Sequence, residues 1–260
     1  MKIPKNILIT GASSGLGAAL ALEYAKPRNT LHLLGRDEIR LEDIAAKCRA
    51  QGANVNIKAV DVTDVNAMRD YIKQADAIAP IDLLIANAGI SAGTGGTTEG
   101  DEQVRKIFAT NIDGMINTIQ PVVPLMLARK SGQIAIISSL AGIRALPSSP
   151  AYSASKACVR YYGEALRGNL LKHNVTVSVI CPGYVITPMT DVNDFPMPFL
   201  MSSQKAAQII ARGLERGKGR IAFPRRLFIP LWWLSCLSPI ITDFIFSRLP
   251  AKPAANRDKF

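Results

Sequence analysis

The chain has 260 residues, 48% of them hydrophobic, which is enough for a sizeable core and ordinary for one α/β domain. Its net charge is +11, but residues 200–260 hold eleven Lys or Arg and three acids, so about +8 of it lies in the last quarter. The four cysteines are scattered and have no nearby histidines, which argues against both a zinc site and a disulfide framework, and we expect no metal.

Short apolar runs, several with β-branched residues, alternate with helical stretches along most of the chain. The runs span residues 6–10, 30–34, 54–60, 83–86, 133–138 and 175–180. This alternation predicts the α/β class, with a doubly wound parallel sheet covered by helices on both faces and a single domain. The most loop-like internal segment is 93–100.

The first run is followed at once by a glycine-rich turn and then by a helical stretch. The turn reads Gly11-Ala-Ser-Ser-Gly15-Leu-Gly17, and residues 18–25 are helical in character. Glycines allow a tight turn and a close backbone approach, while a helix N-terminus offers free N–H groups and a positive dipole end to a pyrophosphate. The pattern favours dinucleotide binding, although an ordinary glycine-rich strand-to-helix turn remains an alternative.

Tyr152 and Lys156 stand four residues apart, thirteen and seventeen residues after Ser139. Positions i and i+4 share one face of a helix, which places the lysine ammonium beside the phenol or beside a ligand bound to both. A phenol titrates near ~10 and becomes a useful acid or base at neutral pH only when a cation stabilises its phenolate. These residues indicate a proton-transfer site, but the spacing alone is equally compatible with a solvated pair on an amphipathic helix.

Taken together, these motifs resemble those of the classical short-chain dehydrogenase/reductase family. The glycine signature Thr-Gly-x-x-x-Gly-x-Gly is matched at residues 10–17, and the Asn-Ala-Gly motif at 87–89. The Ser, Tyr and Lys positions and a Pro-Gly strand end at 182–183 follow in family order. The resemblance covers residues 5 to about 190 and implies a Rossmann-type sheet. Residues 1–200 would then form the dinucleotide-binding and catalytic core, and 201–260 a C-terminal helix with an apolar, basic tail.

The resemblance also implies the site residues. The catalytic set would be Asn111, Ser139, Tyr152 and Lys156. The cofactor-binding set would be Gly11, Ser13, Ser14, Gly15, Leu16, Gly17, Arg36, Asp61, Val62, Asn87, Ala88, Gly89, Tyr152, Lys156, Pro182, Gly183, Val185 and Thr187. Simpler readings remain for some of these: Asn111 as a helix-interior residue, Asp61 as a helix N-cap, and Val185 with Thr187 as a strand-end turn. Ser138 competes with Ser139, but the thirteen-residue spacing to Tyr152 favours Ser139.

The residues after the second predicted strand bear on cofactor choice. In this family an acid at the position of Gly35 would bind both ribose hydroxyls and repel a 2′-phosphate, whereas Gly35 followed by Arg36 accommodates that phosphate. NADP is therefore the expected cofactor, with NAD possible, because Asp37 follows directly and Ser14 stands where a basic residue would help. Arg36 as a solvated loop charge is the alternative.

We expect an NADP-dependent oxidoreductase that transfers a hydride between nicotinamide and a ketone or secondary alcohol. Met189, Phe195, Met197 and Phe199 suggest an apolar or lipid-like substrate. The alternative is a dinucleotide-responsive binding or scaffold protein at a membrane surface, which the complete catalytic set disfavours. The resemblance also implies a homodimer or homotetramer, assembled through residues 101–129 and 153–171.

The tail is the feature least typical of that family. Its uncharged stretch 227–242 is too short to span a bilayer and contains Pro230 and Pro239. Basic residues flank Trp232 and Trp233, which suits peripheral contact with an anionic membrane, but these aromatics could equally cap the substrate pocket or form an oligomer contact. Without a nucleic-acid motif we expect no such partner. The early first strand and the cysteine usage favour a cytoplasmic location, membrane-associated if the tail binds lipid.

Overall fold

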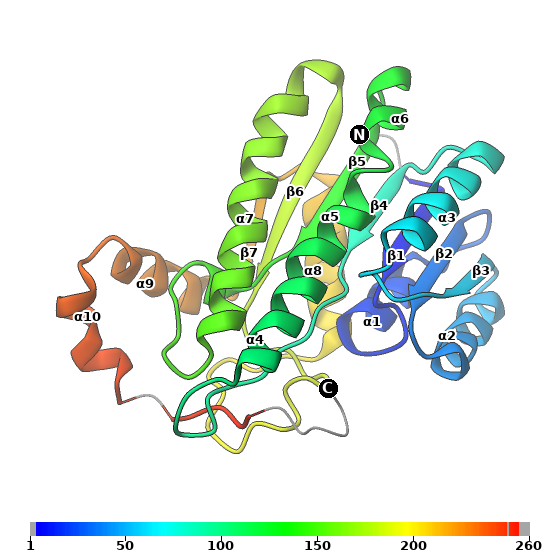
Figure 1. Ribbon diagram of the computed structural model, residues 1–260. Helices are drawn as coiled ribbons and strands as arrows, with labels where there is room; N and C mark the ends of the chain where they lie inside the picture. Colours follow the sequence, from blue (N-terminus) through cyan, green and yellow to red (C-terminus); the bar gives the residue numbers. More distant parts are fainter. Residues whose placement is uncertain (1–3, 249, 255–260) are drawn as a thin grey trace.

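The computed structural model describes residues 4–248 and 250–254, and its centre is a seven-stranded parallel sheet (Figure 1). The strand order is β3-β2-β1-β4-β5-β6-β7. The strands are β1 Asn6–Thr10, β2 Thr30–Gly35, β3 Asn54–Ala59, β4 Leu83–Ala86, β5 Gly132–Ile137, β6 Val175–Pro182 and β7 Arg220–Phe223. All six predicted runs are strands, and the doubly wound, single-domain prediction is confirmed.

Helices connect the strands and cover the sheet. They are α1 Gly15–Tyr24, α2 Glu38–Ala50, α3 Val65–Ile78, α4 Asp101–Phe108, α5 Gly114–Ile119, α6 Val123–Arg129, α7 Pro150–Leu170, α8 Ser203–Glu215, α9 Arg225–Ser235 and α10 Pro239–Phe246. Three short turns of other helix types are η1 Ala109–Asp113, η2 Leu140–Gly142 and η3 Leu171–His173.

The core has two layers because side chains alternate across each strand. On β1, Ile7 and Ile9 pack with residues of α1, α2 and α8, whereas Leu8 packs with residues of α3, α5, α6 and α7. Both faces of the central strands are therefore buried, which accounts for their nearly continuous apolar sequence. This packing fixes the carboxyl ends of the strands, where the site lies.

Residues after 200 contribute to the core before the chain leaves it. α8 packs in the cluster that contains α1, and β7 adds to the sheet edge beside β6, with Val179 opposite Arg220 and Pro182 opposite Phe223. The expected C-terminal helix is thus α8, and the sequence analysis did not anticipate β7. α9 and α10 project from one side of the domain (Figure 1).

One face of the tail rests on the subunit. Leu227, Phe228 and Leu231 of α9 pack against a small cluster that includes Leu140 and Cys181. In α10, Thr242 and Phe246 are buried, and both contact the Arg144 side chain. Phe228 and Leu231 therefore help to stabilise the folded subunit, and the sequence alone did not indicate this role.

The opposite face of the tail is open to solvent. Trp232 is 42% exposed and Trp233 is 64% exposed, so neither is buried within the subunit. Within residues 4–248 and 250–254, no helix combines the length and the apolar content needed to cross a bilayer.

Candidate active site

The glycine turn between β1 and α1 packs closely on itself and on the segment after β4. Gly11 has a φ of +65°, and a Cβ on Gly17 would overlap the Gly11 carbonyl and lie 2.6 Å from Asn87 Nδ2. Ser14, the N-cap residue of α1, makes no side-chain cap bond. The first N–H groups of α1 are therefore available to an anionic ligand.

The segment after β4 holds this turn in place. Asn87 Nδ2 donates to the carbonyl oxygens of Thr10, at 2.9 Å, and Gly11, at 3.2 Å. In return, the Thr10 hydroxyl accepts hydrogen bonds from the backbone N–H groups of Asn87 and Ala88. This contact lies where the strand order reverses between β1 and β4, the point at which open α/β sheets bind their ligands.

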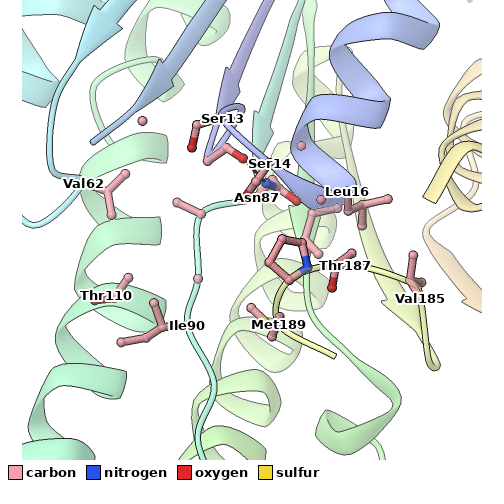
Figure 2. Close-up of a pocket in the computed structure, with 18 of the residues that line it drawn as sticks. Ser13, Ser14, Leu16, Val62, Asn87, Ile90, Thr110, Val185, Thr187 and Met189 are labelled. Atoms are coloured by element: carbon pink, nitrogen blue, oxygen red, sulfur yellow. Dashed lines mark hydrogen bonds between the residues drawn. The ribbon is translucent and has the colours of Figure 1, made fainter. Parts of the chain in front are cut away.

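A cavity of about 410 Å³ opens at this point and extends from Arg36 to Tyr152. Every residue predicted to bind the cofactor lines it. Figure 2 shows its wall built from the loop after β1 and the start of α1 (Ser13, Ser14, Leu16), the segment after β4 (Asn87, Ile90) and the loop after β6 (Val185, Thr187, Met189). The uncapped helix end, the glycine cradle and the mixed polar and apolar lining fit a dinucleotide.

Three of the four predicted catalytic residues also line this cavity. Ser139 follows β5, and Tyr152 and Lys156 lie on one face of α7, as their spacing predicted. Burial raises the pKa of the Tyr152 phenol, while a hydrogen bond with the Ser139 side chain lowers it. A phenol in this setting keeps its proton until a substrate oxygen gains negative charge.

Lys156 is held close to the phenol. Its Nζ lies 5.8 Å from the centre of the Tyr152 ring and donates to the Ile137 carbonyl at 3.0 Å. Burial lowers the pKa of Lys156 to about 8, because desolvation disfavours the ammonium. The lysine is therefore still cationic near neutral pH, but it releases a proton more readily than a surface lysine.

The two adjacent serines have different surroundings. Ser138 is buried, and its hydroxyl donates to the Lys156 carbonyl at 2.7 Å, which ties β5 to α7. Ser139 Oγ accepts a hydrogen bond from the Ala141 N–H and interacts with Tyr152. The geometry supports Ser139 as the serine of the site and gives Ser138 a structural task.

Asn111 lies apart from the cavity lining, in the π-type turn η1 between α4 and α5. Its Nδ2 donates to the Ile90 carbonyl at 3.0 Å and to Ser155 Oγ at 2.9 Å, while its Oδ1 accepts from the Ile90 N–H at 2.8 Å. The side chain thus clamps Ile90, which does line the cavity. Both amide hydrogens are used, so a water relay through this side chain could use only the remaining lone pair of Oδ1.

Charged residues gather at the Arg36 end of the cavity. Arg36 Nη1 lies 3.8 Å from Asp61 Oδ2, and both residues line the cavity. Asp37 is the N-cap of α2 and pairs with Arg40, whose Nε lies 3.1 Å from its Oδ2. Asp64, and not Asp61, caps α3, which removes the N-cap alternative for Asp61.

Sequence reasoning missed Arg40, Ile90 and Thr110, all of which line the cavity, whereas Met189, which it assigned to the substrate, lines the cavity as well. For Arg40 a signal existed, because it stands four residues after Arg36 and three residues after Asp37, an Asp suited to begin a helix. A Cβ at Gly35 would lie 3.3 Å from Ser13 Oγ, a tight contact with the end of a side chain.

Comparison with known proteins decides the family. Residues 5–195 match the short chain dehydrogenase family. The chain belongs to this family. An uncharacterized oxidoreductase of Myxococcus xanthus is 39% identical over 94% of this chain and 97% of its own length. A putative ketoacyl reductase of granaticin polyketide synthase from Streptomyces violaceoruber is 36% identical over 71% of this chain and 69% of its own length.

Among solved structures, a short-chain dehydrogenase from Sphingobium yanoikuyae in complex with NADPH superimposes with a TM-score of 0.79. The two chains are 25% identical, and the superposition covers 97% of this chain and 99% of the Sphingobium chain. The prediction of a short-chain dehydrogenase fold and of an enzyme that depends on NAD or NADP is confirmed. Membership of an oxidoreductase family also disfavours the scaffold alternative.

Proposed function

We propose that the chain is an NADP-dependent oxidoreductase that interconverts ketones and secondary alcohols. The observation that carries the proposal is the cluster of Ser139, Tyr152 and Lys156 at one end of a cavity built for a dinucleotide. The NADPH in the Sphingobium structure and the name of the Streptomyces relative support the cofactor and the carbonyl substrate.

The residues of the site have complementary tasks. When bound, the nicotinamide supplies a hydride to the carbonyl carbon or accepts one from the alcohol. Tyr152 donates a proton to the carbonyl oxygen as negative charge develops there, and Ser139 donates a hydrogen bond to the same atom. Lys156 would stabilise the resulting phenolate and would hold the nicotinamide ribose, while Asn111 positions Ile90 and would offer the remaining lone pair of its Oδ1 to a water on the proton path.

NADPH consumption with a panel of ketones tests this function. The panel should include long-chain methyl ketones and 3-ketoacyl thioesters, the latter because of the named ketoacyl reductase activity of the Streptomyces relative. Turnover of at least one ketone is expected. NADPH binding without turnover of any member would favour the dinucleotide-responsive scaffold.

An apolar substrate is part of the proposal. Met189 lines the cavity beyond Thr187, and Phe195 packs against Tyr184 with their ring centres 6.3 Å apart. Phe199 is exposed in the same loop. We propose that these side chains form an apolar approach for an alkyl chain on the substrate.

We expect NADPH to be preferred over NADH, and Arg36→Ala to reduce the ratio of their kcat/KM values roughly 10- to 100-fold. A hydrogen bond from a charged donor to a phosphate contributes about 1.5–3 kcal/mol, and NADH lacks the 2′-phosphate. Arg40→Ala should also lower the ratio of kcat/KM for NADPH to that for NADH. Steady-state kinetics with both cofactors measure the ratio.

Lys47→Ala is the matched control, since Lys47 lies on α2 but does not line the cavity. A wild-type preference for NADH, or an unchanged ratio in Arg36→Ala, would show that Arg36 is a solvated loop charge.

We also expect a homodimer or homotetramer. The proposed contact surface comprises α4, α5, α6 and α7, and exposed apolar side chains there include Phe108 and Tyr161. Closed symmetry would bury both copies of such a face. Light scattering at micromolar concentration measures the mass, and a monomer would contradict the proposal.

Peripheral membrane contact through α9 and α10 completes the proposed function. The solvent-facing side of these helices carries Ile229, Trp232, Trp233, Ile240 and Phe244, all exposed. Arginines stand at both ends, Arg225 and Arg226 in the first turn of α9 and Arg248 after α10. Exposed aromatics beside basic groups are typical of segments that lie in an anionic lipid interface.

A further inference from the structure

After α10 the chain returns to the domain and docks on the loop that precedes α4 (Figure 1). The backbone N–H of Gly93 donates to the Pro253 carbonyl at 2.8 Å, and that of Gly95 donates to the Lys252 carbonyl at 3.0 Å. Residues 252–254 are therefore attached, by backbone bonds, to a loop that lies close to the catalytic helix α7.

The glycines of this loop make the close approach possible. A Cβ on Gly93 would overlap the Lys252 carbonyl and lie 2.5 Å from Lys252 Cβ. Gly95 has a φ of +59° and would bring a Cβ within 3.1 Å of Ala254 Cβ. In contrast, a Cβ on Gly100 would meet nothing within 4 Å. The loop sequence thus accommodates the docked segment, which gives that segment a defined place.

Docking brings Lys252 to the catalytic tyrosine. Its Nζ lies 5.5 Å from the centre of the Tyr152 ring and donates to Ser91 Oγ at 2.6 Å. Ser91 directly follows Ile90, the cavity residue that Asn111 holds. Lys252 does not itself line the cofactor cavity, so it approaches Tyr152 from outside the dinucleotide site.

The Lys252 ammonium is poorly compensated. Within residues 4–248 and 250–254, no carboxylate lies within ion-pair distance of it, and its hydrogen bond goes to a neutral hydroxyl. Burial lowers its pKa to about 8. A lysine has three N–H donors, and burial of an unpaired cation is costly, so an anion placed here would gain both charge compensation and hydrogen bonds.

We propose that Lys252 determines substrate specificity by binding an anionic group, a carboxylate or a phosphate ester, on a substrate whose carbonyl lies at Tyr152. The inference rests on the proposed ketone reductase function and adds to it. Together with the apolar approach past Met189, it describes an amphipathic substrate in which an acidic group stands a short spacer away from the reacting carbonyl.

Matched substrate pairs test the proposal through the ratio of kcat/KM for the anionic and the neutral member. The pairs are 2-oxo, 4-oxo and 5-oxo alkanoic acids with their methyl esters, and dihydroxyacetone phosphate with dihydroxyacetone. The wild type should favour the anionic member of at least one pair. Lys252→Gln should lower that ratio roughly 10-fold or more, as expected for loss of a charge-assisted hydrogen bond. Lys252→Arg should retain most of the preference.

Two glycine variants separate docking from charge. Gly93→Ala should lower the same ratio by displacing residues 252–254, whereas Gly100→Ala should not. A lowered ratio for the keto acid pairs indicates that Lys252 binds a carboxylate, and a lowered ratio for the dihydroxyacetone pair indicates that it binds a phosphate ester.

A wild type without preference for any anionic member would overturn the proposal, as would a ratio that Lys252→Gln leaves unchanged. In both cases turnover of the neutral ketones would still support the proposed function. If no ketone is turned over at all, the proposed function fails, and calorimetric titration with hexanoate, hexyl phosphate and hexanol decides the role of Lys252. If the wild type binds an anion more tightly than the alcohol and Lys252→Gln loses this difference, the proposed role of Lys252 is supported. If the wild type and Lys252→Gln bind all three compounds equally, or bind none of them, that role is contradicted.

Discussion

Tyr152→Phe should lower kcat by about 10²- to 10⁴-fold, while the fold and cofactor affinity change little. The substitution removes only the hydroxyl that interacts with Ser139 and would deliver the proton. The ring remains, so the packing between Lys156 and Lys252 is retained. Because the lost interaction belongs to the transition state, kcat and kcat/KM should fall together and KM should change little.

Steady-state kinetics with the best ketone of the panel and calorimetric titration with NADPH measure the two effects. Tyr161→Phe is the matched control, because Tyr161 lies on the same helix, is exposed and does not line the cavity. Near-normal turnover in Tyr152→Phe would show that another group transfers the proton.

The local part of this site could be predicted from the sequence because helix and strand periodicity are local properties. The four-residue spacing of Tyr152 and Lys156 places both on one face of α7, and the glycine spacing after residues 6–10 indicates the turn before α1. Burial of Ile7, Leu8 and Ile9 on alternate faces of the sheet is likewise a property of any central strand in a parallel sheet.

Other features depend on contacts between distant parts of the chain. β7 has only four residues, begins with an arginine and is a strand because it pairs with β6. In the sequence, Phe228 and Leu231 cannot be told apart from the exposed apolar residues of the tail, but in the structure they pack against Leu140 and Cys181. Lys252 reaches Ser91 across 161 residues, and nothing in the residues around it indicates that contact. Helix and strand periodicity carries no information about contacts between residues that are far apart in the sequence.

The second large effect concerns the tail, which should bind reversibly to anionic vesicles and release them at high salt. Transfer of apolar surface from water contributes about 25 cal/mol per Å², so burial of Trp232, Trp233 and Phe244 in an interface contributes several kcal/mol. Each arginine near an anionic surface adds roughly 1 kcal/mol. Phe228 and Leu231 contribute little to this contact, because they already pack on the subunit.

Vesicle flotation measures the binding, and substitutions test it better than truncation. Removal of residues from 223 onward would cut β7 and delete the segment that docks on Gly93 and Gly95. The double substitution Trp232→Ser with Trp233→Ser leaves those contacts intact and should abolish recovery with phosphatidylserine-containing vesicles. Ile78→Ser, at a side chain that is 79% exposed on α3, is the control for a general loss of surface hydrophobicity.

The salt and lipid dependence separates the alternatives for this surface. If basic and apolar groups act together, recovery should require anionic lipid and fall as salt screens Arg225, Arg226 and Arg248. Binding to neutral vesicles that salt does not affect would show that the apolar side chains act alone. If the wild type never floats, and the double substitution instead lowers the mass seen by light scattering, the exposed face of α9 and α10 is an oligomer contact, because loss of the tryptophans then weakens a contact between copies of the chain.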